Sequence, residues 1–367
     1  MTQVLHLLPC EPDLQASRLA AALRRSSDRQ VEIVTRTIGR GGDYRNVAHA
    51  VAALRLGRGP TFDVVHAWDR STLIAATRGE APVIYSLSDS AARLPAGFRA
   101  QMMYRQVHLV STTHAGRAAC MRRQMPPDRC HVISPPVDFG SIRQGRNEAF
   151  RQALGLGPEE LAILVPEEPA GAGRHGLALH IVSILHVLEP RYRILLWGRG
   201  EHVAACGRLA RKLKQPKLIV QAERQLGRRV EFEELLSAAD MALVTARQAE
   251  PAYPMALCMA AGLPIVAGLS VIVKELLSDG RSATIAPTFQ PRDLAQRVMK
   301  LAENPARAAS LGEAAAADAR RQFDPSRVVE EYRLLYRRVA GPCHPGVEPR
   351  RDSALSTMTV TGPSLAR

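Results

Sequence analysis

The sequence predicts an α/β protein made of two similar domains in which helices cover parallel sheets. Short apolar runs alternate with longer segments in which Ala, Leu and Arg recur at helical spacing, and this alternation is typical of strand-helix units. At 367 residues the chain also exceeds what one hydrophobic core usually holds. The alternation breaks in a Pro-rich and polar stretch at 135–147 and then starts again. We therefore expect two α/β domains, each with its own core.

In the first half, apolar and β-branched runs mark the expected strands, at residues 4–8, 31–35, 63–68, 83–88, 108–113 and 131–134. Segments with helical spacing lie between some of them, at residues 13–25, 45–56 and 115–124. The succession of strand, helix and strand favours an open parallel sheet.

The second half begins with an expected helix in EAFRQALGL (148–156). The pair Gly157-Pro158 follows it and marks its end. Apolar runs then predict strands at residues 161–167, 193–198, 217–221, 241–246, 263–267 and 283–287. Helical spacing predicts the final helices at residues 291–303, 305–321 and 325–340. The residues after Gly341 are rich in Pro, Ser and charge without a periodic apolar face, which predicts disorder. The expected divisions are 1–145, 146–322, 323–340 and 341–367.

The composition is that of a globular protein, with 46% hydrophobic residues and a mean hydropathy of −0.10. The six cysteines form no CxxC pair and no cluster with histidines at metal-ligand spacing, so neither a metal site nor a disulfide scaffold is expected, and no motif calls for a cofactor. The N-terminus lacks a basic segment before its apolar run, and no stretch approaches 18 apolar residues. A cytoplasmic protein that at most touches the inner face of a membrane is expected.

The net charge of +14 favours acidic partners, which include a nucleotide, an anionic membrane face and nucleic acid. The densest basic run, RLARKLKQPK (208–217), has two readings: the solvated face of one helix, or a patch for phosphate or membrane. Nucleic acid is disfavoured because the basic residues are scattered and no aromatic residues alternate with them.

A Gly-rich loop, GAGRHG (171–176), follows an expected strand and opens an expected helix. A dehydrogenase would place an acid at the end of the next strand, but RILLWGRG ends in Gly and Arg, which disfavours a dinucleotide site. Gly171 and Gly173 let the backbone approach a ligand closely, and the helix N-terminus with Arg174 and His175 offers donors to a diphosphate. A tight turn without a ligand is the alternative reading.

The segment LLSAADMALVTARQAEPAYPMALCMAAGLPIVAGLSVIVKELLSDG (235–280) resembles the retaining nucleotide-sugar glycosyltransferases of family 4. The matching positions are Asp240, Met259, Gly262, Pro264, Val266, Glu275, Asp279 and Gly280. Weaker matches extend from Val4 to about Tyr336, including DVVHAW (63–68) and VISPPVDFGSI (132–142). The resemblance implies the GT-B fold: two Rossmann-like α/β/α domains facing across a cleft, with a C-terminal helix that crosses back to the first domain.

The sequence departs from the family at its donor site. The family uses two glutamates eight residues apart; Glu250 matches the first, while Leu257 or Cys258, depending on the alignment, stands at the second. His175 takes the place of a phosphate-binding Lys, with Arg174 as the nearest cation. In the first domain, Ser88 occupies the position of the family's His and is followed by Asp89.

The resemblance implies transfer of a hexose from a nucleotide sugar with retention of configuration, to an acceptor that is a saccharide, a lipid or a small molecule. Such transfer depends mainly on positioning the reacting groups and on stabilising the leaving diphosphate. Glu250 would hold the sugar hydroxyls, while Tyr253 and Pro254 begin the helix that points at the phosphates. Ser88 and Asp89 would lie on the acceptor side. The alternative is a catalytically silent relative that binds a ligand or a partner.

Overall fold

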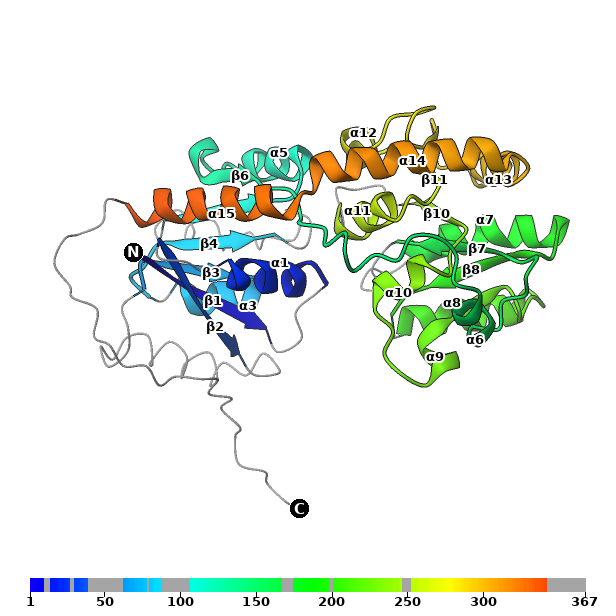
Figure 1. Ribbon diagram of the computed structural model, residues 1–367, viewed down its shortest axis with the longest axis horizontal. Coiled ribbons are helices and arrows are strands. Elements are labelled where there is room, and N and C mark those ends of the chain that lie inside the picture. Colours follow the sequence, from blue (N-terminus) through cyan, green and yellow to red (C-terminus); the bar gives the residue numbers. More distant parts are fainter. Residues whose placement is uncertain are drawn as a thin grey trace, which may run out of the picture. The chain divides into compact units, whose positions relative to one another are not determined.

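The computed structural model describes residues 1–9, 14–26, 30–38, 62–77, 79–87, 106–166, 174–198, 201–245 and 252–341. They form two compact units. The first unit contains the described residues between 1 and 86 together with 106–109 and 331–341. The second unit contains Leu87 and the described residues between 110 and 330. Figure 1 shows their helices and strands.

The first sheet has six strands in the order β2-β1-β3-β4-β5-β6. Their bounds are β1 Thr2–Pro9, β2 Val31–Ile38, β3 Val64–Ala67, β4 Val83–Ser86, β5 Val107–Ser111 and β6 Cys130–Val132. Strand β1 lies next to the edge strand and pairs in parallel with β2 and β3, so that Val4 lies opposite Ile33 and Val64. Most buried residues of β1 and β3 are apolar, because helices cover parallel sheets on both faces, and the buried histidines His6 and His66 are exceptions.

The helices that accompany this sheet are α1 (Leu14–Arg25), α3 (Arg70–Ala76) and α5 (His114–Arg122), with a short 3₁₀ turn at Pro127–Arg129. Sequence periodicity predicts α1 and α5 but misses α3, which is only seven residues long. A capping box defines the start of α3, because Asp69 accepts from the Thr72 amide and Thr72 accepts from the Asp69 amide.

The second sheet also has six strands, in the order β12-β11-β10-β7-β8-β9. Their bounds are β7 Leu161–Val165, β8 Tyr192–Leu196, β9 Ile219–Gln221, β10 Met241–Val244, β11 Ile265–Gly268 and β12 Thr284–Ala286. The helices are α6 Glu148–Ala153, α7 Arg174–Leu188, α8 Glu201–Lys212, α9 Ala222–Leu226, α10 Phe232–Leu236, α11 Ala252–Ala260, α12 Val271–Leu276, α13 Pro291–Ala302 and α14 Pro305–Gln322. The two parallel α/β halves confirm the predicted fold class.

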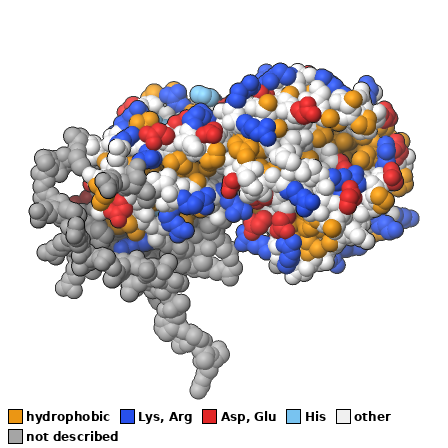
Figure 2. Space-filling model, viewed as in Figure 1, with side chains coloured by type: hydrophobic (Ala, Val, Ile, Leu, Met, Phe, Trp, Pro, Cys, Tyr) orange, Lys and Arg blue, Asp and Glu red, His pale blue; other side chains and the backbone are white. Residues whose placement is uncertain are grey.

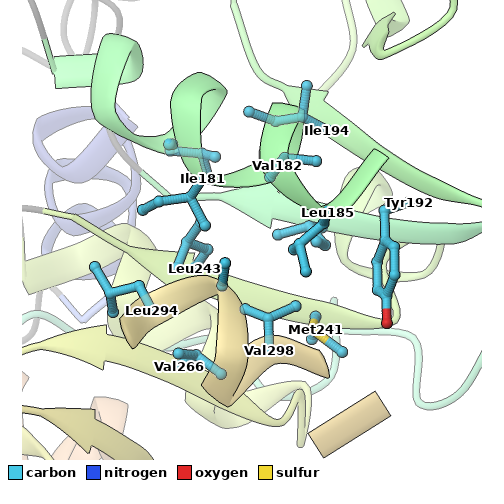
Figure 3. Close-up of a cluster of buried hydrophobic side chains, with 14 of the residues drawn as sticks. Ile181, Val182, Leu185, Tyr192, Ile194, Met241, Leu243, Val266, Leu294 and Val298 are labelled. Carbon is cyan, nitrogen blue, oxygen red and sulfur yellow. The ribbon is translucent and has the colours of Figure 1, made fainter. Parts of the chain in front are cut away.

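Helices α7 and α13 pack against one face of the second sheet, where their apolar side chains meet those of the strands (Figure 3). Ile181 and Leu185 of α7 and Val298 of α13 are buried with Leu243 and Val266 of the sheet. On the helices these residues recur every three or four positions, and this spacing forms an apolar stripe. The same spacing in the sequence predicts that both helices cover a sheet.

Helix α11 packs against α14 at a very short separation. A Cβ atom added to Gly312 of α14 would lie 2.0 Å from the carbonyl oxygen of Gly262, so only glycine fits there. Gly262 itself has φ of 69° and ends the helical segment two residues after Ala260. Gly262 therefore marks the end of the helix, and the buried strand β11 begins three residues later.

The C-terminal helix α15 (Pro325–Ala340) enters the first unit from residue 331 onward, as predicted for a helix that crosses back. Its Tyr336 hydroxyl is hydrogen-bonded to His6 Nε2 at 3.0 Å and to His66 Nδ1 at 2.7 Å. Ser86 Oγ links His66 Nε2, at 2.8 Å, to the Tyr332 hydroxyl, at 3.0 Å. This buried polar cluster joins β1, β3 and β4 to the last helix.

The helix expected at 45–56 and the tail from 342 onward lie outside the described residues. The domain boundary at 145/146 and the cleft between the domains stay predictions. Among the helices that the structure describes, none combines the length and the apolar composition needed to span a bilayer.

Candidate functional site

The second sheet has a point at which the order of its strands reverses. From β7 the chain progresses outward to β8 and β9, and from β10 it progresses in the opposite direction to β11 and β12. Strands β7 and β10 are neighbours and parallel, with Ala242 opposite Leu164. In open α/β sheets, ligands bind beyond the carboxyl ends of the two strands at such a reversal. The helices that follow β7 and β10 are α7 and α11, so both begin at this edge.

Helix α7 begins at Arg174, so the last three residues of the predicted Gly-rich loop (171–176) belong to the helix. Gly171, Gly173 and the Arg174 side chain lie outside the described residues. His175, in the first turn, is buried with 2% of its surface exposed. The strand-loop-helix arrangement on which the diphosphate prediction depends is therefore present, and the predicted roles of the four residues stay predictions.

Helix α11 is buried along its whole length. Tyr253 and Pro254 are in its first turn, as the sequence predicts, where a proline removes no hydrogen bond within the helix. Leu257 and Cys258 have 1% and 0% of their surface exposed. Burial raises the pKa of the Cys258 thiol far above its ordinary range, so this side chain is neutral and packs as an apolar group.

Three predicted site residues, Glu250, Ser88 and Asp89, lie outside the described residues. Glu250 falls in the connection between β10 and α11, and Ser88 and Asp89 follow the carboxyl end of β4. Their positions in the chain therefore correspond to strand ends where α/β proteins bind ligands.

Asp240, which matches the family pattern, lies at the opposite edge of the sheet, before β10. Its carboxylate accepts hydrogen bonds from the Ala162 amide at 2.7 Å and from Arg151 Nη1 at 2.9 Å. Arg151 is fully buried and also donates to the carbonyl oxygens of Ala238, at 2.5 Å, and Glu160, at 2.6 Å. Asp240 therefore fixes α6 to the sheet. Its role in the motif is to hold the fold together.

Glu275, another motif residue, caps a helix that is distant in sequence. Its carboxylate oxygens accept from the amides of His114, at 2.6 Å, and Ala115, at 3.1 Å, at the start of α5. Thr113 accepts from the Gly116 amide at 3.0 Å. The first three amides of α5 are thus satisfied, and a negative charge lies at the positive end of the helix. The sequence contained no local signal for this contact.

Replacing Glu275 by Ala is expected to lower the free energy of unfolding by about 1 to 2 kcal/mol, because two helix amides lose a charged acceptor. Urea denaturation followed by circular dichroism measures the change. Glu275→Gln keeps one acceptor oxygen and should lie between Ala and the unsubstituted protein. Glu313→Ala, at an exposed position of α14, is the control. An effect of Glu275→Ala no larger than that of the control would contradict the capping role.

Comparison with known proteins gives a match to the family described as glycosyl transferases group 1, over residues 173–304. A curated relative, D-inositol 3-phosphate glycosyltransferase 2 of Catenulispora acidiphila, is 27% identical over 207 residues. The alignment covers 53% of this chain and 47% of the relative, so the chain spans about half the length of that protein.

Solved structures share the fold across most of the chain. Anabaena HepE, crystallised with UDP and glucose, superposes with a TM-score of 0.74 at 16% identity, over 91% of this chain and 99% of its own. Sucrose-phosphate synthase from Thermosynechococcus elongatus gives a TM-score of 0.70 at 13% identity, over 92% and 99%. WaaG, a glycosyltransferase involved in lipopolysaccharide biosynthesis, gives 0.67 at 17% identity, over 91% and 99%. The chain therefore has the GT-B fold of these solved structures, and residues 173–304 of its second unit are similar to the glycosyl transferases group 1 family.

Proposed function

We propose that this protein transfers a hexose from a nucleotide-sugar donor to an acceptor with retention of configuration. The observation that supports this most directly is the start of α7 and α11 at the carboxyl ends of adjacent strands, where the order of the sheet reverses. Both helices lie within the region that matches the glycosyl transferases group 1 family. The match begins at residue 173, so most of the chain between β7 and α7 lies before it.

The donor diphosphate would bind at the N-terminus of α7. The backbone at Gly171 and Gly173 would approach it closely, and the amides at the N-terminus of the helix together with Arg174 would supply positive charge. His175, whose ring is buried, would contribute a donor at the edge of that site. These groups would stabilise the charge that develops on the leaving diphosphate, which is the main requirement of the reaction.

The sugar would bind next to the start of α11. Glu250 would accept hydrogen bonds from its hydroxyls, and the helix N-terminus formed by Tyr253 and Pro254 would face the phosphates. Leu257 and Cys258 lie one turn further along and are buried and apolar, so neither offers the carboxylate with which the family holds the ribose. The nucleotide would therefore be held mainly through its base and phosphates.

HepE has been crystallised with UDP-glucose, so UDP-sugars are the first donors to test. The acceptor is a saccharide, a lipid or a small molecule that would meet Ser88 and Asp89, which follow β4 in the sequence. A cytoplasmic location is part of the proposal. Nucleic acid is a poor candidate, because on the face shown in Figure 2 the Lys and Arg side chains are scattered among acidic and apolar residues.

Calorimetry with UDP-, GDP- and ADP-sugars tests whether the site binds a donor, and release of free sugar or nucleotide diphosphate tests turnover. Glu250→Ala is expected to reduce turnover of the preferred donor by about 100-fold or more, because the sugar hydroxyls lose a charged acceptor. Glu313→Ala removes an exposed carboxylate from α14 and should leave turnover unchanged.

The same measurements separate the transferase from a catalytically silent relative. Donor binding without turnover under any acceptor condition would favour the silent relative, whose altered donor position at Leu257 and Cys258 accounts for the loss. Binding of none of the three donor classes would reject the nucleotide-sugar site. Equal turnover by Glu250→Ala and the unsubstituted protein would reject the role of Glu250 but not the transferase activity.

A further inference from the structure

Four large apolar side chains are exposed near the ends of the neighbouring helices α7 and α8. Val187 and Leu188, at the end of α7, have 71% and 62% of their surface exposed. Leu209 in α8 and Leu213 just after it have 41% and 45% exposed. Single exposed apolar residues are common on protein surfaces, whereas a group of them marks an interaction site. We call these four residues the α7–α8 patch.

Hydrogen bonds join the two parts of the patch. Ser183 of α7 donates to the Gln215 side chain at 2.7 Å, in the loop that follows α8. Val187 lies one turn after Ser183 and therefore on the same face of α7. Leu213 is two residues before Gln215, and its amide continues the helix by donating to the Leu209 carbonyl oxygen at 2.9 Å. The exposed leucines and Val187 therefore flank one contact between neighbouring helices.

Exposed basic residues lie close in sequence to Leu209 and Leu213 of the patch. Arg208, Arg211, Lys212, Lys214 and Lys217 are all exposed. The last four form no ion pair with any residue that the structure describes. Glu189, which follows Leu188 in the sequence, is paired with Arg191 at 2.6 Å.

We propose that the α7–α8 patch docks on an anionic lipid bilayer. Apolar side chains enter the interface between head groups and acyl chains, and the surrounding cations attract acidic lipids. The combination of the two is what favours a membrane: nucleic acid would use the cations but not Val187 and Leu188, and a second copy of this surface would repel the first.

Some of the basic residues have a structural explanation, because cationic side chains stabilise the negative, C-terminal end of a helix. That explanation covers Arg211 and Lys212 in the last turn of α8. It does not cover Lys214 and Lys217, which lie beyond the helix, or the exposed apolar residues. The solvated-face reading of 208–217 therefore leaves most of the surface unexplained.

The position of the patch leaves the candidate site of the second unit accessible. Helices α7 and α8 end just before the amino ends of β8 and β9, whereas α7 and α11 begin at the carboxyl ends of β7 and β10. Since the sheet is parallel, the patch and the candidate site lie at opposite edges. A bilayer at the patch would therefore not block ligand entry, and the proposal does not depend on the transferase activity.

Co-sedimentation of the full chain with vesicles tests the docking. Vesicles of phosphatidylcholine with phosphatidylglycerol are expected to bind the protein, with weaker binding as salt rises, and vesicles of phosphatidylcholine alone are not. Replacing Lys212, Lys214 and Lys217 by Ala should weaken partitioning on the order of 100-fold, since each cation near an anionic surface contributes about fivefold. Val187→Ser with Leu188→Ser should weaken it roughly tenfold.

Matched controls separate this surface from net charge. The triple variant Arg122→Ala, Arg292→Ala and Arg320→Ala removes three exposed cations from other helices. The double variant Val271→Ser and Leu334→Ser removes two apolar side chains that are 61% and 50% exposed. Both controls should bind vesicles nearly as well as the unsubstituted protein.

Three results would overturn the proposal. One is equal binding to anionic and neutral vesicles. Another is equal loss of binding in the control and patch variants, which would leave net charge as the cause. The third is that the patch variants abolish a concentration-dependent dimer, or retention on RNA, and leave vesicle binding intact.

Discussion

Replacing Asp240 by Ala is expected to lower the free energy of unfolding of the second unit by about 3 to 5 kcal/mol. The guanidinium of Arg151 has none of its side-chain surface exposed, and Asp240 is the acid that approaches it within 2.9 Å. Without that carboxylate the buried guanidinium keeps its carbonyl acceptors but loses its nearest negative charge, leaving Glu148 at 3.9 Å, and the Ala162 amide loses an acceptor. The expected loss is a large fraction of the stability of a typical domain.

Urea denaturation, followed by the fluorescence of Trp197 in the second unit, measures this change. Asp240→Asn is expected to cost less, since its amide oxygen still accepts from the Ala162 amide. Asp293→Ala is the matched control, because its carboxylate pairs with Arg297 at 2.9 Å on a half-exposed face of α13, where a pair contributes less than about 1 kcal/mol. If Asp240→Ala lowers the free energy of unfolding by no more than the control does, Arg151 finds another partner.

Lowering the pH below 6.5 is expected to destabilise the first unit through two buried histidines. Burial lowers the pKa of His6 from 6.5 to about 3, and burial together with the nearby His6 lowers the pKa of His66 well below 6.5. Both rings are therefore neutral when folded, whereas the unfolded chain takes up protons near pH 6.5. Their contribution to stability is complete above pH 6.5 and declines as the pH falls toward the folded pKa.

At pH 5 the decline amounts to about 2 kcal/mol for His6, and His66 adds a further loss in the same direction. Urea midpoints between pH 7 and 5 measure it, with the fluorescence of Trp68 as a local signal, because the Trp68 ring stacks on His66 at 4.1 Å. His6→Gln should reduce this pH dependence, while His180→Gln, at an exposed position, should leave it unchanged. An unchanged urea midpoint at pH 5 would contradict the buried neutral state.

Much of the secondary structure could be predicted from the sequence because its signals are local. Apolar runs predict the ends of most strands in both sheets to within about two residues. Helical spacing, together with Pro and Gly residues at the helix ends, predicts α13, α14 and α15. The site was partly predictable for the same reason. The helix starts at Arg174 and Ala252 follow from the strand, turn and helix signals around them.

The sequence also determined the fold class, since alternating strands and helices leave few arrangements other than parallel sheets covered on both faces. Only the tertiary structure decided which motif residues hold the fold together. Asp240 with Arg151, Glu275 with the α5 amides, and Tyr336 with two histidines are pairs separated by 89 to 330 positions. No periodicity records such contacts, because burial of a charge or a polar group becomes stable only when distant segments supply its partner.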